Sequence, residues 1–138
     1  MKELELEALN DNLPQVLALV DEVLEAAHCP GKIQFQIDIA VEEIFVNIAH
    51  YAYKPDVGTA TVRVEVMGEP PAVDITFIDS GVPYDPLAKA DPDVTLSAEQ
   101  RQIGGLGIFM VKKTMDDIKY EYIDGHNILT LKKGLVVE

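Results

Sequence analysis

Two segments of alternating apolar residues, separated by a short turn, limit the folds open to this chain more than any other feature. Residues 61–67 read TVRVEVM and residues 73–79 read VDITFID, so an apolar residue recurs at every second position in both. This period is typical of a strand that buries one face and exposes the other to water. Because a glycine and two prolines lie between the segments, a turn is expected there, and the pair is predicted to form a hairpin.

The rest of the chain supplies three more strands and three helices. The further predicted strands are residues 1–8, 118–123 and 128–133, the last two joined by a turn at residues 124–127. The predicted helices are residues 13–27, 33–51 and 108–115. Strands joined mostly as hairpins, without regular βαβ alternation, predict an α+β two-layer sandwich. Its helices would lie on one face of a mixed, largely antiparallel sheet.

The composition favours one globular domain. The chain has 138 residues, of which 48% are apolar and 25% charged, and this suits a single domain over residues 1–138. No stretch approaches the roughly 18 uninterrupted apolar residues of a membrane span. The start, MKELELEALNDN, is unlike a secretory signal, so a cytoplasmic location is expected. The single cysteine, Cys29, excludes an intrachain disulfide and supports neither a zinc site nor a redox pair.

The net charge of −13 restricts the partners of the chain. Such a surface repels nucleic-acid backbones and anionic lipids, so neither nucleic acid nor membrane is an expected partner. If the chain binds a nucleotide, lysine and arginine cannot neutralise most of the phosphate charge. Backbone amides, a helix N-terminus and a bound cation would then have to do so.

The second predicted helix carries polar residues on an otherwise apolar surface. Isoleucine, valine and phenylalanine cover most of its circumference, which indicates a helix that is buried or nearly so. Glu43 and Asn47 share the remaining stripe, one turn apart, with His50 beside them. Because burying an unpaired carboxylate is costly, something must compensate. The pair is either a hydrogen bond at a solvated helix edge or a site that meets a cation or polarises a hydroxyl.

A second polar group, DSGVPYDP, begins at the end of the strand predicted over residues 73–79. Asp79 would lie at the rim of the sheet, where Gly81 lets the backbone turn sharply. Its carboxylate could accept a hydrogen bond from an exocyclic amine. The same residue types also make ordinary turns, so both interpretations stay open from this segment alone.

A glycine cluster precedes the last predicted helix. Residues 84–103 show no sustained periodicity, which indicates a functional loop or a disordered segment. The loop leads to Gly104, Gly105 and Gly107, where the free amides of a helix N-terminus would favour an anion. The cluster matches neither GxGxxG nor the GxxxxGK[ST] phosphate loop, and a flexible hinge is the alternative interpretation.

Taken in order, these motifs resemble the GHKL superfamily of ATP-binding domains. The order is Glu-x-x-x-Asn on a helix, Asp-x-Gly at a strand end, and a long loop that closes on Gly-Gly-x-Gly before a helix. Residues 127–132 are similar to the family's final strand, and the resemblance covers about residues 33–133. Residues 79–86 and 104–108 are most similar to the anti-sigma-factor serine/threonine kinases. Many of these kinases have a histidine four residues after the asparagine, where this chain has Tyr51.

The resemblance implies a Bergerat-type ATP-binding fold and a role for each motif. Glu43 is implied as the general base and Asn47 as the ligand of Mg²⁺. Asp79 would bind the adenine amine, with Gly81 allowing close approach and Thr130 supplying a hydroxyl. Residues 84–103 would form the ATP lid. The other implied nucleotide contacts are Tyr84, Arg101, Gly104, Gly105, Leu106, Gly107 and Ile108.

The implied function is a regulatory serine/threonine protein kinase that uses ATP and Mg²⁺. It would phosphorylate a small anti-anti-sigma protein of the STAS type and sequester a sigma factor, and a homodimer is a further expectation. Two alternatives stay open: a non-catalytic module that uses ATP to switch partners, and a simple ATP hydrolase in which Glu43 activates water. The intact Glu43 favours chemistry over binding alone.

Overall fold

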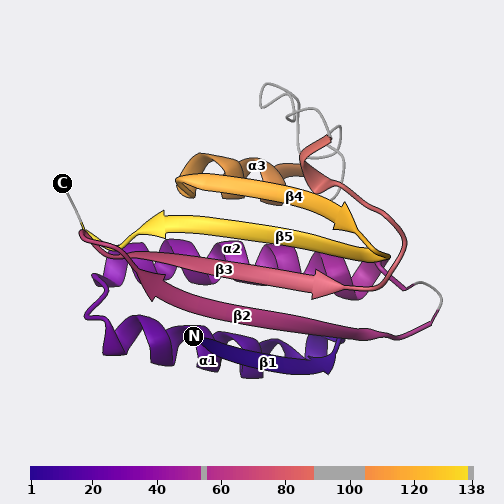
Figure 1. Cartoon of the computed structure of the whole chain (residues 1–138), viewed down its shortest axis with the longest axis horizontal. Coiled ribbons are helices and arrows are strands. Elements are labelled where there is room, and N and C mark those ends of the chain that lie inside the picture. Colours follow the sequence, from indigo (N-terminus) through magenta and orange to yellow (C-terminus); the bar gives the residue numbers. More distant parts are fainter. Residues whose placement is uncertain (54–55, 89–104, 137–138) are drawn as a thin grey trace.

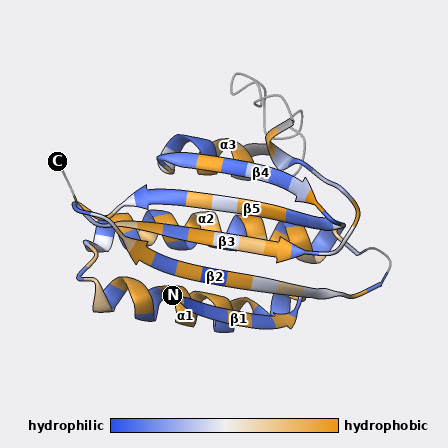
Figure 2. Cartoon of the chain, viewed as in Figure 1, coloured by the Kyte–Doolittle hydropathy of each residue, from blue (hydrophilic) through white to orange (hydrophobic). Residues whose placement is uncertain are grey.

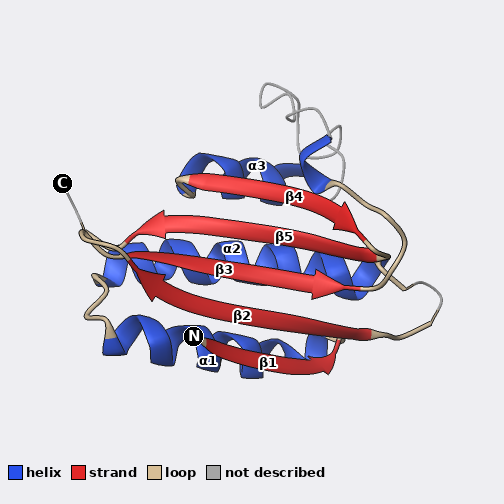
Figure 3. Ribbon diagram, in the orientation of Figure 1, coloured by secondary structure: helices blue, strands red, loops and turns tan. Residues whose placement is uncertain are grey.

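A five-stranded sheet with helices on one face forms the fold (Figure 1; Figure 3). The computed structural model describes residues 1–53, 56–88 and 105–136. Its strands are β1 (Lys2–Glu7), β2 (Thr59–Met67), β3 (Ala72–Asp79), β4 (Asp117–Ile123) and β5 (His126–Gly134). Its helices are α1 (Leu13–Ala26), α2 (Gly31–Tyr51) and α3 (Gly105–Thr114), with short 3₁₀ turns η1 (Asn10–Asn12) and η2 (Pro86–Ala88).

The strand order brings distant parts of the sequence together. The order is β1-β2-β3-β5-β4, and each neighbouring pair is antiparallel. The β3–β5 register places Asp79 opposite Asn127 and Thr76 opposite Thr130. The end of β3 and the start of β5 therefore meet at one end of the sheet, beside the C-terminal half of α2 (Figure 1).

The core lies between the sheet and the helix layer. Along β3, Val73, Ile75 and Phe77 are buried, whereas the residues between them are partly exposed on the helix-free face. Figure 2 shows this alternation of apolar and polar residues along the strands. Full burial of an apolar side chain of this size contributes about 1.5–3 kcal/mol. α2 is the central helix and packs against both α1 and α3.

The predicted α+β sandwich is confirmed, with differences in pairing and at the element boundaries. The described pairings are all antiparallel, so the sheet is not mixed. α3 begins at Gly105, earlier than the predicted residue 108, because part of the glycine cluster is helical. The β4–β5 turn consists of Asp124 and Gly125 alone, both at positive φ, since a two-residue hairpin turn of this kind needs a left-handed backbone at both positions.

The segment between β3 and α3 is described only in part. Of the loop predicted over residues 84–103, residues 84–88 are described and include η2. Residues 89–103, and with them most of the predicted lid, lie outside the described residues. Within the described ranges, no helix has both the length and the apolarity needed to cross a membrane.

Candidate functional site

A small pocket lies where the end of β3, the start of β5 and the C-terminal half of α2 meet. Its volume is about 40 Å³, little more than the space that one water molecule occupies in the liquid. Most of the lining is apolar, and the polar groups come from a few side chains. The lining residues are Ile44, Asn47, Ile48, Tyr51, Ala52, Phe77, Asp79, Val82, Tyr84, Pro86, Tyr120, Asn127 and Leu129.

Asp79 supplies the buried carboxylate of this pocket. It is the last residue of β3, and only 6% of its surface is exposed to solvent. Its Oδ1 accepts hydrogen bonds from the backbone N–H of Gly81 and from Nδ2 of Asn127, both at 2.9 Å. In the described part of the chain, no hydrogen bond engages its Oδ2. One oxygen is therefore fixed by the protein, and the other is left for a donor such as an amine.

Asn127 holds this end of the pocket together, and the sequence interpretation gave it no role of its own. Its Nδ2 donates to Asp79 and, at 2.9 Å, to the carbonyl oxygen of Val82. Its Oδ1 accepts from the backbone N–H of Tyr84 and from the hydroxyl of Tyr120. The alternation of side chains along β5 could have indicated this position. Asn127 is two residues before the buried Leu129 and four before the buried Leu131, so its side chain must also face the helices.

Thr130 does not line this pocket, and its contact with adenine stays a prediction. Successive side chains of a strand point to opposite faces of the sheet. Asn127 and Leu129 face the helices, so Thr130, the residue after Leu129, lies on the helix-free face. There its hydroxyl is 3.3 Å from the hydroxyl of Thr76, its partner on β3. The polar side chain that β5 turns toward the pocket is Asn127.

Gly81 is required for a reason different from the one predicted. A Cβ atom at this position would lie 2.1 Å from the carbonyl oxygen of Ala52, near the end of α2. The next residue, Val82, donates its backbone N–H to that same oxygen at 2.9 Å. Glycine therefore lets the loop after β3 pack directly on α2. This contact fixes the Asp79 turn whether or not a ligand also approaches it.

Two tyrosines lie together along the pocket. The rings of Tyr51 and Tyr84 stack with their centroids 5.8 Å apart and their planes 27° from parallel. Tyr84 belongs to the loop after β3, whereas Tyr51 is the last residue of α2. Both rings line the pocket, so they offer an aromatic wall beside Asp79.

Glu43 and Asn47 lie one turn apart on α2, as predicted. Nδ2 of Asn47 donates to Oε1 of Glu43 at 3.3 Å, which leaves the amide oxygen of Asn47 for another partner. Burial raises the pKa of the Glu43 carboxyl, the hydrogen bond from Asn47 opposes this rise, and the negative charge of Glu42 adds to it. A carboxylate whose pKa lies closer to neutrality is a better general base than an exposed glutamate.

The first turn of α3 lies against Glu43. A Cβ atom on Gly107 would lie 2.1 Å from Cδ of Glu43 and 2.3 Å from both carboxylate oxygens. Only glycine allows this approach, which brings the carboxylate to a helix start whose first amides have no partner within the helix.

The remaining predicted contacts are only partly described. Gly105 and Leu106 belong to the first turn of α3, where their amides can face an anion. The side chain of Ile108 is buried in the core, so only its backbone can contribute to a ligand site. Arg101 and Gly104 lie outside the described residues.

The sequence also matches a known protein family. The match is to the family described as histidine kinase-like ATPase domain, and it spans residues 6–133. The chain belongs to this family. Among the histidine kinase-like ATPase domains, the serine/threonine-protein kinase BtrW of Bordetella bronchiseptica is 27% identical over 101 residues, which make up 73% of this chain and 70% of that protein.

Two further relatives are called serine-protein kinase RsbW. The protein of Bacillus cereus is 32% identical over 98 residues, covering 68% of this chain and 60% of its own length. The protein of Listeria monocytogenes is 29% identical over 100 residues, covering 70% of this chain and 63% of its own length. The chain thus spans less than two thirds of the length of these two relatives.

Two solved structures share the fold of this chain. The crystal structure of RsbU and RsbW domains from Mycobacterium tuberculosis has a TM-score of 0.64 at 17% identity, covering 98% of this chain and 33% of the other. The SiaB–SiaC complex from Pseudomonas aeruginosa has a TM-score of 0.59 at 17% identity, covering 94% of this chain and 88% of the other.

Proposed function

We propose that this chain is a cytoplasmic, ATP-dependent serine/threonine protein kinase of the anti-sigma-factor type. One domain over residues 1–138 would phosphorylate a small anti-anti-sigma protein of the STAS type and would sequester a sigma factor, with a homodimer as the working form. The names of the curated relatives support the kinase activity. The geometry around Glu43 is the single observation that carries the proposal.

Glu43 has the surroundings that a proton acceptor for phosphoryl transfer needs. Its carboxylate is half-buried, its pKa is raised by burial, and Oε1 is held by Asn47 at 3.3 Å. It abuts Gly107 in the first turn of α3, where backbone amides favour phosphate oxygens. A residue that only filled space at this contact would not need to be a carboxylate.

The residues present fit ATP, provided that the pocket opens. Asp79 offers a buried carboxylate oxygen to the adenine amine, and its other oxygen is fixed by Gly81 and Asn127. Tyr51 and Tyr84 offer aromatic surface beside it. The roughly 40 Å³ volume requires Tyr84 to leave its stack on Tyr51, which agrees with a lid that includes residues 84–88.

The residues present also fit Mg²⁺ that is held mainly by the nucleotide. In the described residues, no three His, Cys, Asp or Glu side chains gather as a metal site. The hydrogen bond from Asn47 to Glu43 uses Nδ2 of the amide and not its oxygen. An amide oxygen is the type of ligand that Mg²⁺ accepts. ATP would supply the phosphoryl group, and the metal would neutralise part of its charge.

Each side chain then has one task. Asp79, held by Asn127, would bind the adenine end, and Asn47 would supply an oxygen ligand to the metal. Glu43 accepts the proton from the incoming serine or threonine hydroxyl. Gly105, Leu106 and Gly107 offer their backbone amides to the phosphates, which agrees with a site whose described lining contains no lysine or arginine.

Incubation with labelled ATP, Mg²⁺ and candidate antagonist proteins tests this function. Label on a serine or threonine of an antagonist supports the kinase. Release of free phosphate without protein labelling would instead identify an ATP hydrolase, with Glu43 activating water. Nucleotide binding without either product would identify a non-catalytic partner-switching module, and both of these outcomes would contradict the proposal.

A further inference from the structure

A second and larger groove lies at the end of the sheet opposite the pocket. It is bounded by the start of α2, the β2–β3 turn and the end of β5, and its volume is about 530 Å³. This volume is within the range of about 300–1,000 Å³ that is usual for small-molecule sites. No part of the proposed kinase chemistry uses it.

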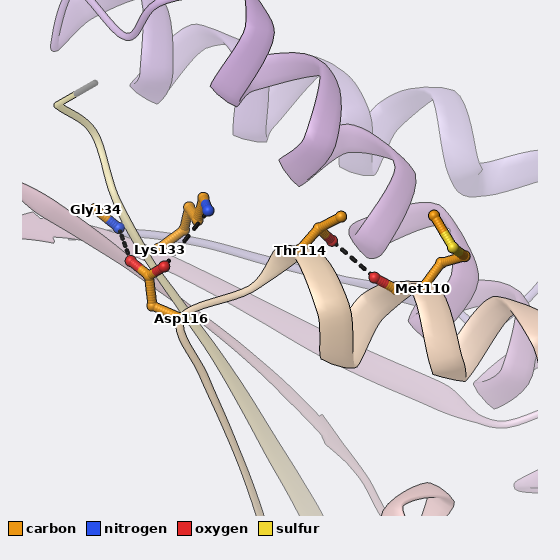
Figure 4. A network of polar contacts seen from close by, with 5 residues as sticks. All are labelled: Met110, Thr114, Asp116, Lys133 and Gly134. Atoms are coloured by element: carbon orange, nitrogen blue, oxygen red, sulfur yellow. Dashed lines mark hydrogen bonds and ion pairs between the residues drawn. The ribbon is translucent and has the colours of Figure 1, made fainter. Parts of the chain in front are cut away.

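Lys133 projects into this region from β5. It is two residues after the buried Leu131, so it lies on the same face of the sheet, the one that faces the helices. Its side chain is only 18% exposed. Its described ion-pair partner is Asp116, whose Oδ1 is 3.4 Å from Nζ. The other oxygen of Asp116 accepts the backbone N–H of Gly134 at 2.6 Å (Figure 4). The ammonium of this mostly buried side chain thus has one long contact, with the carboxylate of a side chain that is itself 55% exposed.

The charge of the groove is opposite to that of the whole chain. The chain has 24 acidic and 11 basic residues. The described lining of the groove nevertheless includes three lysines, at positions 32, 132 and 133, and one acidic residue, Asp116. Lys32 is in the first turn of α2 and lines the same groove as Lys133. Three lysines against one carboxylate give this lining an excess of positive charge, which favours an anionic occupant.

We propose that this groove binds a small oxyanion, a phosphate or a carboxylate, between Lys133 and Lys32. Lysine ammonium groups recognise both kinds of group as point charges. In the bound state, the occupant would become the closer partner of Lys133, and the long contact with Asp116 would become secondary. The site is separate from the nucleotide pocket, so the proposal does not depend on the kinase function.

Residue-resolved NMR titration of the full chain, without nucleotide or Mg²⁺, tests the site. One arm uses inorganic phosphate, another uses citrate, and a third uses sodium chloride at matched ionic strength. We expect saturable amide shifts at Ile33, Ala72 and Gly134 with phosphate, with citrate or with both. The titration that saturates shows whether the site binds phosphate, carboxylate or either group. Shifts equal to those in chloride, or shifts confined to Asp79 and Gly107, would overturn the proposal.

Two variants and a matched control sharpen the test. Lys133→Gln and the exposed Lys32→Gln each remove one charge, and each should weaken the saturable binding by about tenfold or more. Lys119→Gln removes a lysine that pairs with Glu121 on β4, away from the groove, and should leave it unchanged. Because Lys32 is exposed, its variant is informative even if Lys133→Gln fails to fold. Equal affinity of Lys32→Gln and wild type would contradict the assignment.

Discussion

Asn127 shows how one side chain can organise a site. It hydrogen-bonds to β3 through Asp79, to the following loop through Val82 and Tyr84, and to β4 through Tyr120. The Asp79 carboxylate therefore has a fixed orientation before any ligand arrives. This preorganisation reduces the cost of ordering the site on binding.

Two variants test directly whether Asn127, and not Thr130, supports the nucleotide pocket. Asn127→Ala should weaken ATP binding by about 5- to 100-fold, because it frees the Asp79 carboxylate and leaves its neighbours without partners. Thr130→Ala, on the helix-free face, should change the affinity by less than about twofold. Calorimetry measures both, with thermal unfolding as the control for folding. A loss confined to Thr130→Ala would show that the assignment of faces is wrong.

Asp38 is a partly buried titratable group outside the nucleotide pocket. Its Oδ1 has no hydrogen-bond partner. Burial, contact with the Asp21 carboxyl and the charge of Glu25 raise the pKa of Asp38 from 3.8 to about 7. The folded state therefore holds a proton that the unfolded state releases near pH 4. The free energy of unfolding should decrease as the pH rises from about 4 to about 7.

Asp38→Asn should flatten this pH dependence. The amide stays neutral and can donate to Asp21, so the variant should be more stable than wild type at pH 8 and close to it at pH 4. Urea denaturation at the two pH values measures the effect, and Asp11→Asn, an exposed change in η1, is the control. If wild type and Asp38→Asn have parallel pH profiles, Asp38 is ionised in the fold like any surface aspartate.

The sequence contained part of the site but not its details. Glu43, Asn47 and Asp79 could be found because each is polar at a position where an apolar or turn residue would suffice. Asn127 could have been found from the alternation of faces along the strand, because it is two residues before Leu129. The resemblance instead implied the hydroxyl of Thr130. The Tyr51–Tyr84 stack could not be predicted, because it depends on how a loop folds back onto the end of α2.

At the scale of elements, the close contact between α2 and α3 brings Glu43, the proposed general base, to the start of α3, where we propose that the phosphates bind. Periodicity predicted both helices, but it could not predict where α3 begins. Glycines usually disfavour a helix, but Gly107 lies within α3, and its position requires glycine because a Cβ there would clash with Glu43. The tertiary contact, which the local pattern does not contain, determines this boundary.

Gly107→Ala tests the contact between the two helices. The new Cβ would lie 2.1 Å from Cδ of Glu43, so either the carboxylate or α3 must shift. Phosphoryl transfer should fall by at least about tenfold, and overpacking should lower the stability by about 1–3 kcal/mol. Gly31→Ala is the matched control, because a Cβ there meets nothing within 4 Å. Similar transfer rates in both variants would show that Glu43 and α3 do not need this approach.

At the scale of the whole molecule, the net charge of −13 leads us to expect that nucleotide binding depends on a divalent cation. The chain has only 11 lysine and arginine residues against 24 aspartate and glutamate residues, so a bound cation is expected to offset much of the phosphate charge. We expect ATP affinity to fall by about tenfold or more when a chelator removes divalent cations. Calorimetry with and without the chelator, at equal ionic strength, measures this. Unchanged affinity would mean that protein groups alone neutralise the phosphates.

The most direct test of the kinase proposal compares two adjacent glutamates. Glu43 is half-buried against Gly107, whereas Glu42 is exposed on the same helix. Glu43→Gln keeps the size of the side chain but cannot accept a proton. Transfer of labelled phosphate from ATP to an antagonist should therefore fall by about 10²–10⁴-fold, with ATP affinity retained. Glu42→Gln should stay within about threefold of wild type. Equal transfer rates in the two variants, with both folded, would contradict a catalytic role for Glu43.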